Sequence, residues 1–169
     1  VKKVHVIFKT HLDIGFTDLA ANVVDQYMTT FIPQALSLSE RMTGDDGRSK
    51  FIWTVGSWLI EEYLQNAPEE QRIQMEHAIS KGVIAWDGLP FTTHTELMDK
   101  TVFEYGISIS RKLDQQFGKK TIAAKMTDVP SQGSVLATAL AQAGVDFLHI
   151  GCNWPSGEVK YPPLFWWEG

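Results

Sequence analysis

His11 and Asp13 lie two residues apart, directly after an apolar run, and both are of types that bind metal ions. The run, 4–8, is flanked by lysines and is typical of a buried strand. Side chains two residues apart on extended backbone point the same way, so the imidazole and the carboxylate can converge. Both groups are good zinc ligands, with bonds of about 2.0–2.2 Å. Because H-x-D is a common pattern, a helix-capping Asp beside a structural His is the alternative.

Asp128 is a third candidate ligand. It follows the strand-like segment 121–126 and begins a loop that contains a proline. The catalytic and binding residues of parallel α/β proteins lie at the carboxyl ends of the strands, so Asp128 is expected at the same edge of the sheet as His11 and Asp13. Three such ligands leave zinc an open position. Ordinary turn chemistry is the alternative, since Asp before a Pro-containing loop is common.

Other expected strand ends carry residues that could contact a substrate. Trp53 and Trp86 could form the wall of a binding site or pack in the core, and Asp87 could supply a second carboxylate. His94 lies in the polar loop T-T-H-T-E, where a functional and a structural role remain equally open. The sequence has no G-x-S-x-G elbow, and Cys152 lacks a convincing His/Asn arrangement. Nucleophilic serine or cysteine chemistry is therefore not expected.

The elements that must position these residues alternate between strand and helix. We expect strands at 4–8, 51–55, 83–86, 121–126 and 147–150, a sixth strand beginning within 162–169, and helices at 18–42, 57–65, 68–82, 100–117 and 134–143. Thr17 is the expected cap of the first helix, which Pro33 should kink or divide. The alternation predicts parallel strands with right-handed crossovers, in an open sheet or a barrel. Glycine-rich nucleotide-binding motifs are lacking after the first strand.

Composition narrows the class of protein further. A chain of 169 residues with 44% hydrophobic and 21% charged residues is expected to form one globular domain. The net charge is −5 and the basic residues are scattered, which disfavours nucleic-acid binding. No apolar run approaches the roughly 20 residues that a membrane span needs. Localisation stays open, with the cytoplasm slightly favoured because there is no signal-peptide pattern and only one cysteine.

The two motifs together resemble glycoside hydrolase family 38, the α-mannosidases, in the N-terminal part of the catalytic domain. The family motif H-x-H-x-D-x-G-W aligns with 9–16, K-T-H-L-D-I-G-F, and the strand that ends in the family's catalytic Asp aligns with 123–130, A-A-K-M-T-D-V-P. The segment 140–148, L-A-Q-A-G-V-D-F-L, is similar to the family's next helix-to-strand connection. Lys9 replaces the first His of the motif and Phe16 replaces the Trp, which indicates a divergent branch.

The resemblance implies an α/β fold, the parallel (β/α) incomplete barrel of the glycoside hydrolase/deacetylase type. Residues 1–169 would be the N-terminal part of one catalytic domain, truncated at the C-terminus and holding only its first five or six strands. It also implies a zinc-dependent retaining glycosidase that hydrolyses α-linked sugars. Asp128 would be the nucleophile, His11, Asp13 and Asp128 would bind Zn²⁺, and Phe16 would pack under the sugar. The fourth zinc ligand and the general acid would lie downstream, so the isolated chain is expected to be inactive.

Two alternatives remain. A metal-dependent carbohydrate deacetylase on a related barrel would use zinc-bound water as its nucleophile, but no expected loop of the sequence carries the H-x₃₋₅-H pair that such enzymes typically add. A non-catalytic carbohydrate-binding domain on the same fold is the other alternative. All three interpretations have a carbohydrate as partner.

Overall fold

The computed structural model describes residues 2–129, 131–151 and 162–168. Contacts within the chain group the residues into two compact units, Val1–Trp86 and Asp87–Gly169. Cys152 lies outside the described residues. Among the described helices, none combines the length and the apolar character that crossing a membrane requires.

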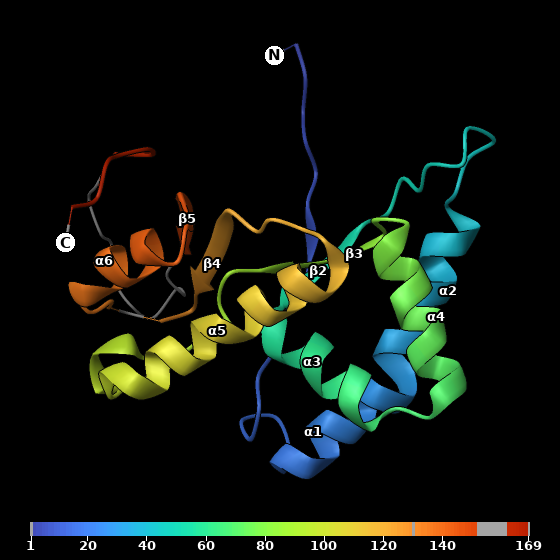
Figure 1. Cartoon of the computed structure of the whole chain (residues 1–169), viewed down its shortest axis with the longest axis horizontal. Helices are drawn as coiled ribbons and strands as arrows, with labels where there is room; N and C mark the ends of the chain where they lie inside the picture. The colour runs from blue at the N-terminus through green and yellow to red at the C-terminus, as the bar shows by residue number, and fades with distance from the viewer. Residues whose placement is uncertain (1, 130, 152–161, 169) are drawn as a thin grey trace. The chain divides into compact units, whose positions relative to one another are not determined.

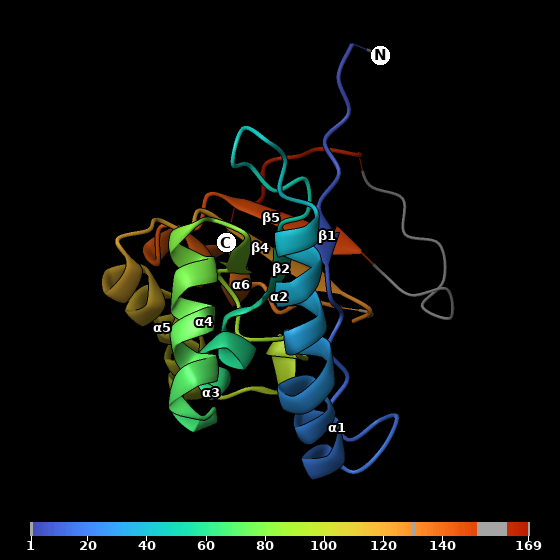
Figure 2. The same cartoon turned by 90° about the vertical axis from the view of Figure 1, so that its right-hand side faces the viewer.

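The first unit combines a small sheet with helices (Figures 1 and 2). Its elements are β1 (Phe8–Lys9), α1 (Ala20–Gln26), the π-helix η1 (Tyr27–Phe31), α2 (Ile32–Arg41), β2 (Trp53–Gly56), α3 (Ser57–Asn66), α4 (Glu69–Ser80) and β3 (Ile84–Asp87), whose last residue begins the second unit. The strand order is β1-β2-β3, and β1 runs parallel to β2, with Phe8 opposite Trp53. The core of this unit consists of side chains from all of its helices and from β2 and β3, among them Val23, Ile32, Val55, Leu59, Ile60, Tyr63, Met75, Ile79 and Ile84.

The apolar run before β1 is not the buried strand that the sequence predicts. The strand covers only Phe8 and Lys9, and Val4, Val6 and Ile7 are exposed. The register explains the difference. Phe8 pairs with the first residue of β2, so no strand described in this sheet lies opposite the residues that precede it.

The long helix expected at 18–42 is divided, as the position of Pro33 predicts. It begins at Ala20 rather than after Thr17, because Leu19 has a non-helical ψ of 139°. The Asp18 carboxylate accepts the Leu19 amide proton at 2.7 Å. Pro33 has no N–H, and in a regular α-helix its ring would clash with the carbonyl of the residue four positions earlier. The chain avoids the clash with η1, where the Ile32 amide donates to the Tyr27 carbonyl five residues back.

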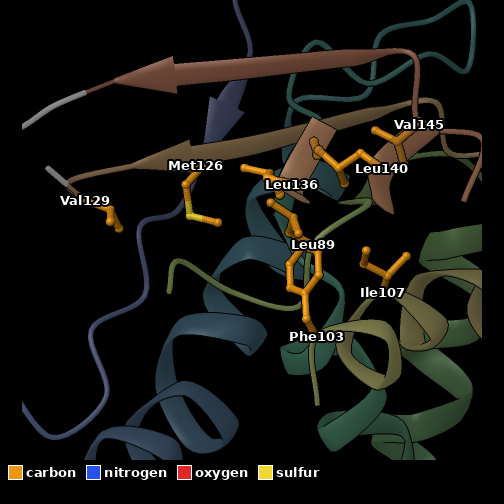
Figure 3. Close-up of a cluster of buried hydrophobic side chains, with 9 residues drawn as sticks. Leu89, Phe103, Ile107, Met126, Val129, Leu136, Leu140 and Val145 are labelled. Atoms are coloured by element: carbon orange, nitrogen blue, oxygen red, sulfur yellow. The ribbon is translucent and has the colours of Figure 1, made fainter. Parts of the chain in front are cut away.

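The second unit contains the 3₁₀ turn η2 (Thr95–Leu97), α5 (Lys100–Phe117), β4 (Ala123–Thr127), α6 (Val135–Gln142) and β5 (Phe147–Gly151). Strands β4 and β5 are parallel and pair along their whole length, from Ala123 opposite Phe147 to Thr127 opposite Gly151. Figure 3 shows the core between them and the helices. Its buried side chains come from α5, β4, α6 and the adjoining loops: Leu89, Phe103, Ile107, Ala124, Met126, Val129, Leu136, Leu140 and Val145.

The prediction of a sixth strand near the end of the chain is wrong for the described residues there, 162–168, which contain no strand. Two consecutive prolines, Pro162 and Pro163, remove the amide donors that a strand ladder would need. Trp166 is 95% exposed, whereas Trp167 packs against the core of the second unit. The α/β class and the parallel pairing are confirmed, with short strands in two sheets. The incomplete barrel stays a prediction.

Candidate metal and sugar site

His11 and Asp13 are in contact in the first unit. The distance from His11 Nε2 to Asp13 Oδ1 is 3.0 Å, and the two side chains are 30% and 38% exposed. Two ligands of a tetrahedral zinc ion are roughly 3.4 Å apart when each bond is about 2.1 Å. The pair is therefore close to the spacing of two zinc ligands, and the two donors are of the types that zinc prefers.

Neighbouring elements hold this pair in place. Thr10 donates its amide proton to the Thr54 carbonyl at 3.1 Å, and its hydroxyl accepts the indole N–H of Trp53 at 2.6 Å. On the other side of His11, the Tyr27 hydroxyl donates to the His11 carbonyl at 3.4 Å. Both ends of the short segment after β1 are thereby fixed, one to β2 and the other to η1.

The pKa of Tyr27 also depends on the charge of Asp13. Burial raises the pKa of the Tyr27 phenol, and the nearby negative charge of Asp13 raises it further. The sequence analysis missed Tyr27 as a supporting residue, because it reads there as one more member of an apolar helical stripe. A hydroxyl at an otherwise buried aromatic position was the only signal.

Asp128 ends β4 in the second unit, in the position that the sequence predicts. It is exposed and has a φ of 71°, in the left-handed region that Asp tolerates better than most residues. Its amide donates to the Gly151 carbonyl at 2.9 Å, so the β4–β5 ladder extends to this residue. The three predicted zinc ligands are divided between the units, His11 and Asp13 in the first and Asp128 in the second.

The aromatic candidates differ in exposure. Phe16 is 85% exposed, so its ring is free to contact a ligand, whereas Trp53 and Trp86 are each only 6% exposed. Burial of this degree fits the core-packing alternative for the two tryptophans. Their contact with a substrate stays a prediction.

Asp87 and His94 lie on either side of the polar segment that follows β3. Asp87 is 6% exposed and accepts the Leu89 amide proton at 3.0 Å, which fixes the turn directly after the strand. His94 is exposed, and its Nδ1 is 3.9 Å from Glu96 Oε1. A hydrogen bond from the Ser131 hydroxyl is the main cause that lowers the pKa of Glu96. Glu96 and Ser131 were not among the predicted site residues, although both follow expected strand ends.

Comparisons with known proteins address the fold. No protein-family model matches the sequence, and no curated protein does. An α-mannosidase from Enterococcus faecalis V583 matches 86% of the chain with a TM-score of 0.67 at 12% identity. A 4-α-glucanotransferase from Thermococcus litoralis matches 84% with a TM-score of 0.58 at 15% identity. Each match covers more of the chain than either unit contains, so it extends into both units.

The chain spans only a small part of these two enzymes, 16% of the α-mannosidase and 21% of the glucanotransferase. Identities this low show the fold alone. The chain has the fold of a part of carbohydrate-active enzymes, that is, a glycosidase-type fold.

Proposed function

We propose that the chain is the N-terminal part of the catalytic domain of a zinc-dependent retaining glycosidase, α-mannosidase-like and on a divergent branch of glycoside hydrolase family 38. The observation that carries the proposal is the contact between His11 and Asp13 at the end of the first strand, at 3.0 Å. It occurs in a chain whose fold matches part of an α-mannosidase. The substrate class is an α-linked sugar.

Asp128 is the proposed nucleophile. Its carboxylate attacks the anomeric carbon, a bond forms between the carboxylate oxygen and that carbon, and the bond to the leaving oxygen breaks. The leaving oxygen takes a proton from a general acid, which the family resemblance places beyond residue 169. Water then cleaves the glycosyl–enzyme bond and releases the sugar with retained configuration.

His11, Asp13 and Asp128 are the residues proposed to hold zinc. When bound, the ion supplies a template and a Lewis acid for the sugar hydroxyls. Phe16 is the aromatic ring proposed to stack on the sugar, since it is exposed. Trp53 and Trp86 are weaker candidates for the same role, because they are buried. Asp87 and His94 are further candidates for substrate contact.

Zinc content tests the proposal. We would measure zinc by elemental analysis in the full-length protein and in Asp13→Ala and Asp128→Ala variants. The expected result is about one zinc per wild-type chain and a clear loss in both variants. Asp25→Ala is the matched control, because Asp25 is an exposed carboxylate on α1 that is not in the predicted ligand set.

Zinc that is absent, or that is indifferent to both substitutions, would contradict the proposal and leave a carbohydrate-binding domain as the better interpretation. With zinc present, turnover of an aryl α-mannoside separates the glycosidase from the two alternatives. Release of acetate from an acetylated sugar would instead indicate a deacetylase.

A further inference from the structure

Two loops of the second unit are joined by side-chain hydrogen bonds. The Thr95 hydroxyl accepts the Gly133 amide proton at 2.9 Å and donates to Gln132 Oε1 at 3.4 Å. The Ser131 hydroxyl donates to Glu96 Oε1 in a short hydrogen bond. We call these five residues, Thr95, Glu96, Ser131, Gln132 and Gly133, the loop clamp. It connects the turn η2 with the segment that follows Asp128.

Thr95 is the buried member of the loop clamp. Only 4% of the residue is exposed, and both of its hydroxyl hydrogen bonds go to the segment 131–133. A buried hydroxyl that satisfies a backbone amide cannot be removed without leaving that amide unpaired or letting the loop move. Thr95 therefore determines where this segment lies.

Asp128 is held between two fixed points. On one side its amide continues the β4–β5 ladder through the Gly151 carbonyl. On the other side Val129 is buried in the core, and the loop clamp begins at Ser131. A residue other than glycine at a φ of 71° needs such support, because the conformation is sparsely populated and persists when its surroundings fix it.

Glu96 is suited to accept a hydrogen bond and poorly suited to donate a proton. Its pKa is lowered, first by the Ser131 hydroxyl, and His94 adds a smaller contribution in the same direction. The carboxyl group is therefore charged at neutral pH. This property agrees with a structural acceptor and argues against Glu96 as the missing general acid.

We propose that Thr95 and Glu96 are positioning residues for Asp128, which fix the segment 131–133 and thereby the direction in which the Asp128 carboxylate leaves the end of β4. The inference rests on the proposed function, because the two residues act on the reaction only through the nucleophile. Neither residue touches the substrate in this role.

The test uses Thr95→Val in the full-length protein, with Thr95→Ser as the conservative variant that keeps the hydroxyl. Thr93→Val is the matched control, since the Thr93 hydroxyl contacts Met98 Sδ and not the segment 131–133. Ser131→Ala is a second, milder variant in case Thr95→Val fails to fold, because Ser131 is exposed.

The first readout is hydrogen exchange resolved to single amides. We expect the amides of Gly133 and Asp128 to exchange about tenfold faster in Thr95→Val and to stay unchanged in Thr95→Ser and Thr93→Val. The second readout is turnover of an aryl α-mannoside. We expect kcat to fall by about 10- to 100-fold while KM changes by less than about twofold, since a displaced nucleophile affects the transition state more than ground-state binding.

The outcomes separate the two proposals. Faster exchange at Gly133 without a change at Asp128 overturns the positioning role, and so does an unchanged kcat in a variant whose Asp128 amide has loosened. If both amides exchange faster in Thr95→Val but the wild-type protein cleaves no α-glycoside, the result supports the positioning role and contradicts the proposed glycosidase.

Discussion

The contact between His11 and Asp13 depends on neighbouring parts of the first unit. It is supported by the backbone of β2, by Trp53 through Thr10, and by Tyr27 through the His11 carbonyl. A pair that is already assembled loses little conformational entropy when an ion binds. The supporting contacts come from distant parts of the sequence, so the H-x-D pattern alone could not predict them.

The charge of Asp13 affects the pKa of Tyr27, so a substitution of Asp13 can be followed by titrating Tyr27. Because Asp13 is the second cause of the raised pKa of Tyr27, we expect Asp13→Asn to lower that pKa. The pKa should still remain above its usual value, since burial is the larger cause. Ultraviolet titration of tyrosine ionisation, with Tyr27→Phe to identify the signal, measures the change. Asp25→Asn should leave the titration unaltered, and an equal shift in that control would contradict the proximity of Asp13.

The Ser131–Glu96 hydrogen bond gives a second prediction for single residues. We expect Ser131→Ala to raise the pKa of Glu96 toward its ordinary value of 4.5, because the largest cause of the lowering is removed. NMR titration of the Glu96 carboxyl carbon measures it. Ser134→Ala is the control, since Ser134 makes no side-chain capping bond at the start of α6. No change in Ser131→Ala would show that the bond is not formed in solution.

The same shift sets a pH window for the loop clamp. The pKa of Glu96 is lower in the folded chain than in the unfolded chain, so its charged form stabilises the fold. That contribution is complete above the unfolded value and is lost as the pH falls through the lowered folded value. We therefore expect the Ser131–Glu96 bond of the loop clamp to be intact at neutral pH and to weaken as the pH falls through the lowered pKa of Glu96.

At the scale of elements, the sequence predicts best where the end signals are local. Helix α5 spans Lys100–Phe117 as predicted, because Asp99 caps its start through the Thr101 amide and Gly118 ends it with a φ of 62°. Strands β2, β3 and β4 begin one or two residues later than predicted and β1 has only two residues, whereas β5 begins at the predicted residue and extends one residue further. Strand ends are harder to predict because they depend on partner strands. The described segment 162–168 forms no strand for a different reason, because Pro162 and Pro163 lack the amide donors that a strand ladder needs.

Gly88, directly after β3, lies close to the Val145 side chain, and this allows a prediction about packing. A Cβ atom added at Gly88 would lie 2.7 Å from Cγ2 of Val145, which is buried in the core of the second unit. We expect Gly88→Ala to lower the free energy of unfolding by about 1–3 kcal/mol, as overpacking does. Urea denaturation measures the change.

A double variant supplies the control for this packing prediction. Val145→Ala removes the clashing methyl group, so Gly88→Ala should cost much less in the Val145→Ala background than in the wild type. Equal costs in the two backgrounds would assign the effect of Gly88→Ala to its backbone rather than to the contact with Val145.

For the whole molecule, the alternation of strand and helix predicted the α/β class and the parallel pairing, which depend on local periodicity. It did not predict that contacts divide the chain at Trp86 into two units. The candidate site follows the same division. The convergence of His11 with Asp13 could be predicted because it depends on two neighbouring residues, whereas the addition of Asp128 depends on tertiary arrangement and stays a proposal.

The chain covers only a small part of each enzyme that it matches, and this leads to a prediction about activity. The chain spans 16% of the α-mannosidase that it matches, and the resemblance places the general acid beyond residue 169. We expect residues 1–169 alone to release no detectable product from an aryl α-mannoside, while the full-length protein releases it. Parallel assays at equal concentration measure the difference, with circular dichroism to show that the short chain is folded. Turnover by the short chain would mean that it contains its own acid.

The π-helical segment η1 makes the number of residues between α1 and α2 matter as much as their identity. A π turn accommodates one more residue than an α turn, so η1 behaves as an insertion within an otherwise continuous helix. Winding the same residues into regular α turns, with Pro33 replaced so that such a helix can form, would rotate everything before η1 by about 100° relative to α2. The Tyr27 hydroxyl would then point away from the His11 carbonyl. A relative of this chain that keeps this length but has a regular helix in place of η1 would thus lose one support of the His11–Asp13 pair with every side chain of the pair unchanged.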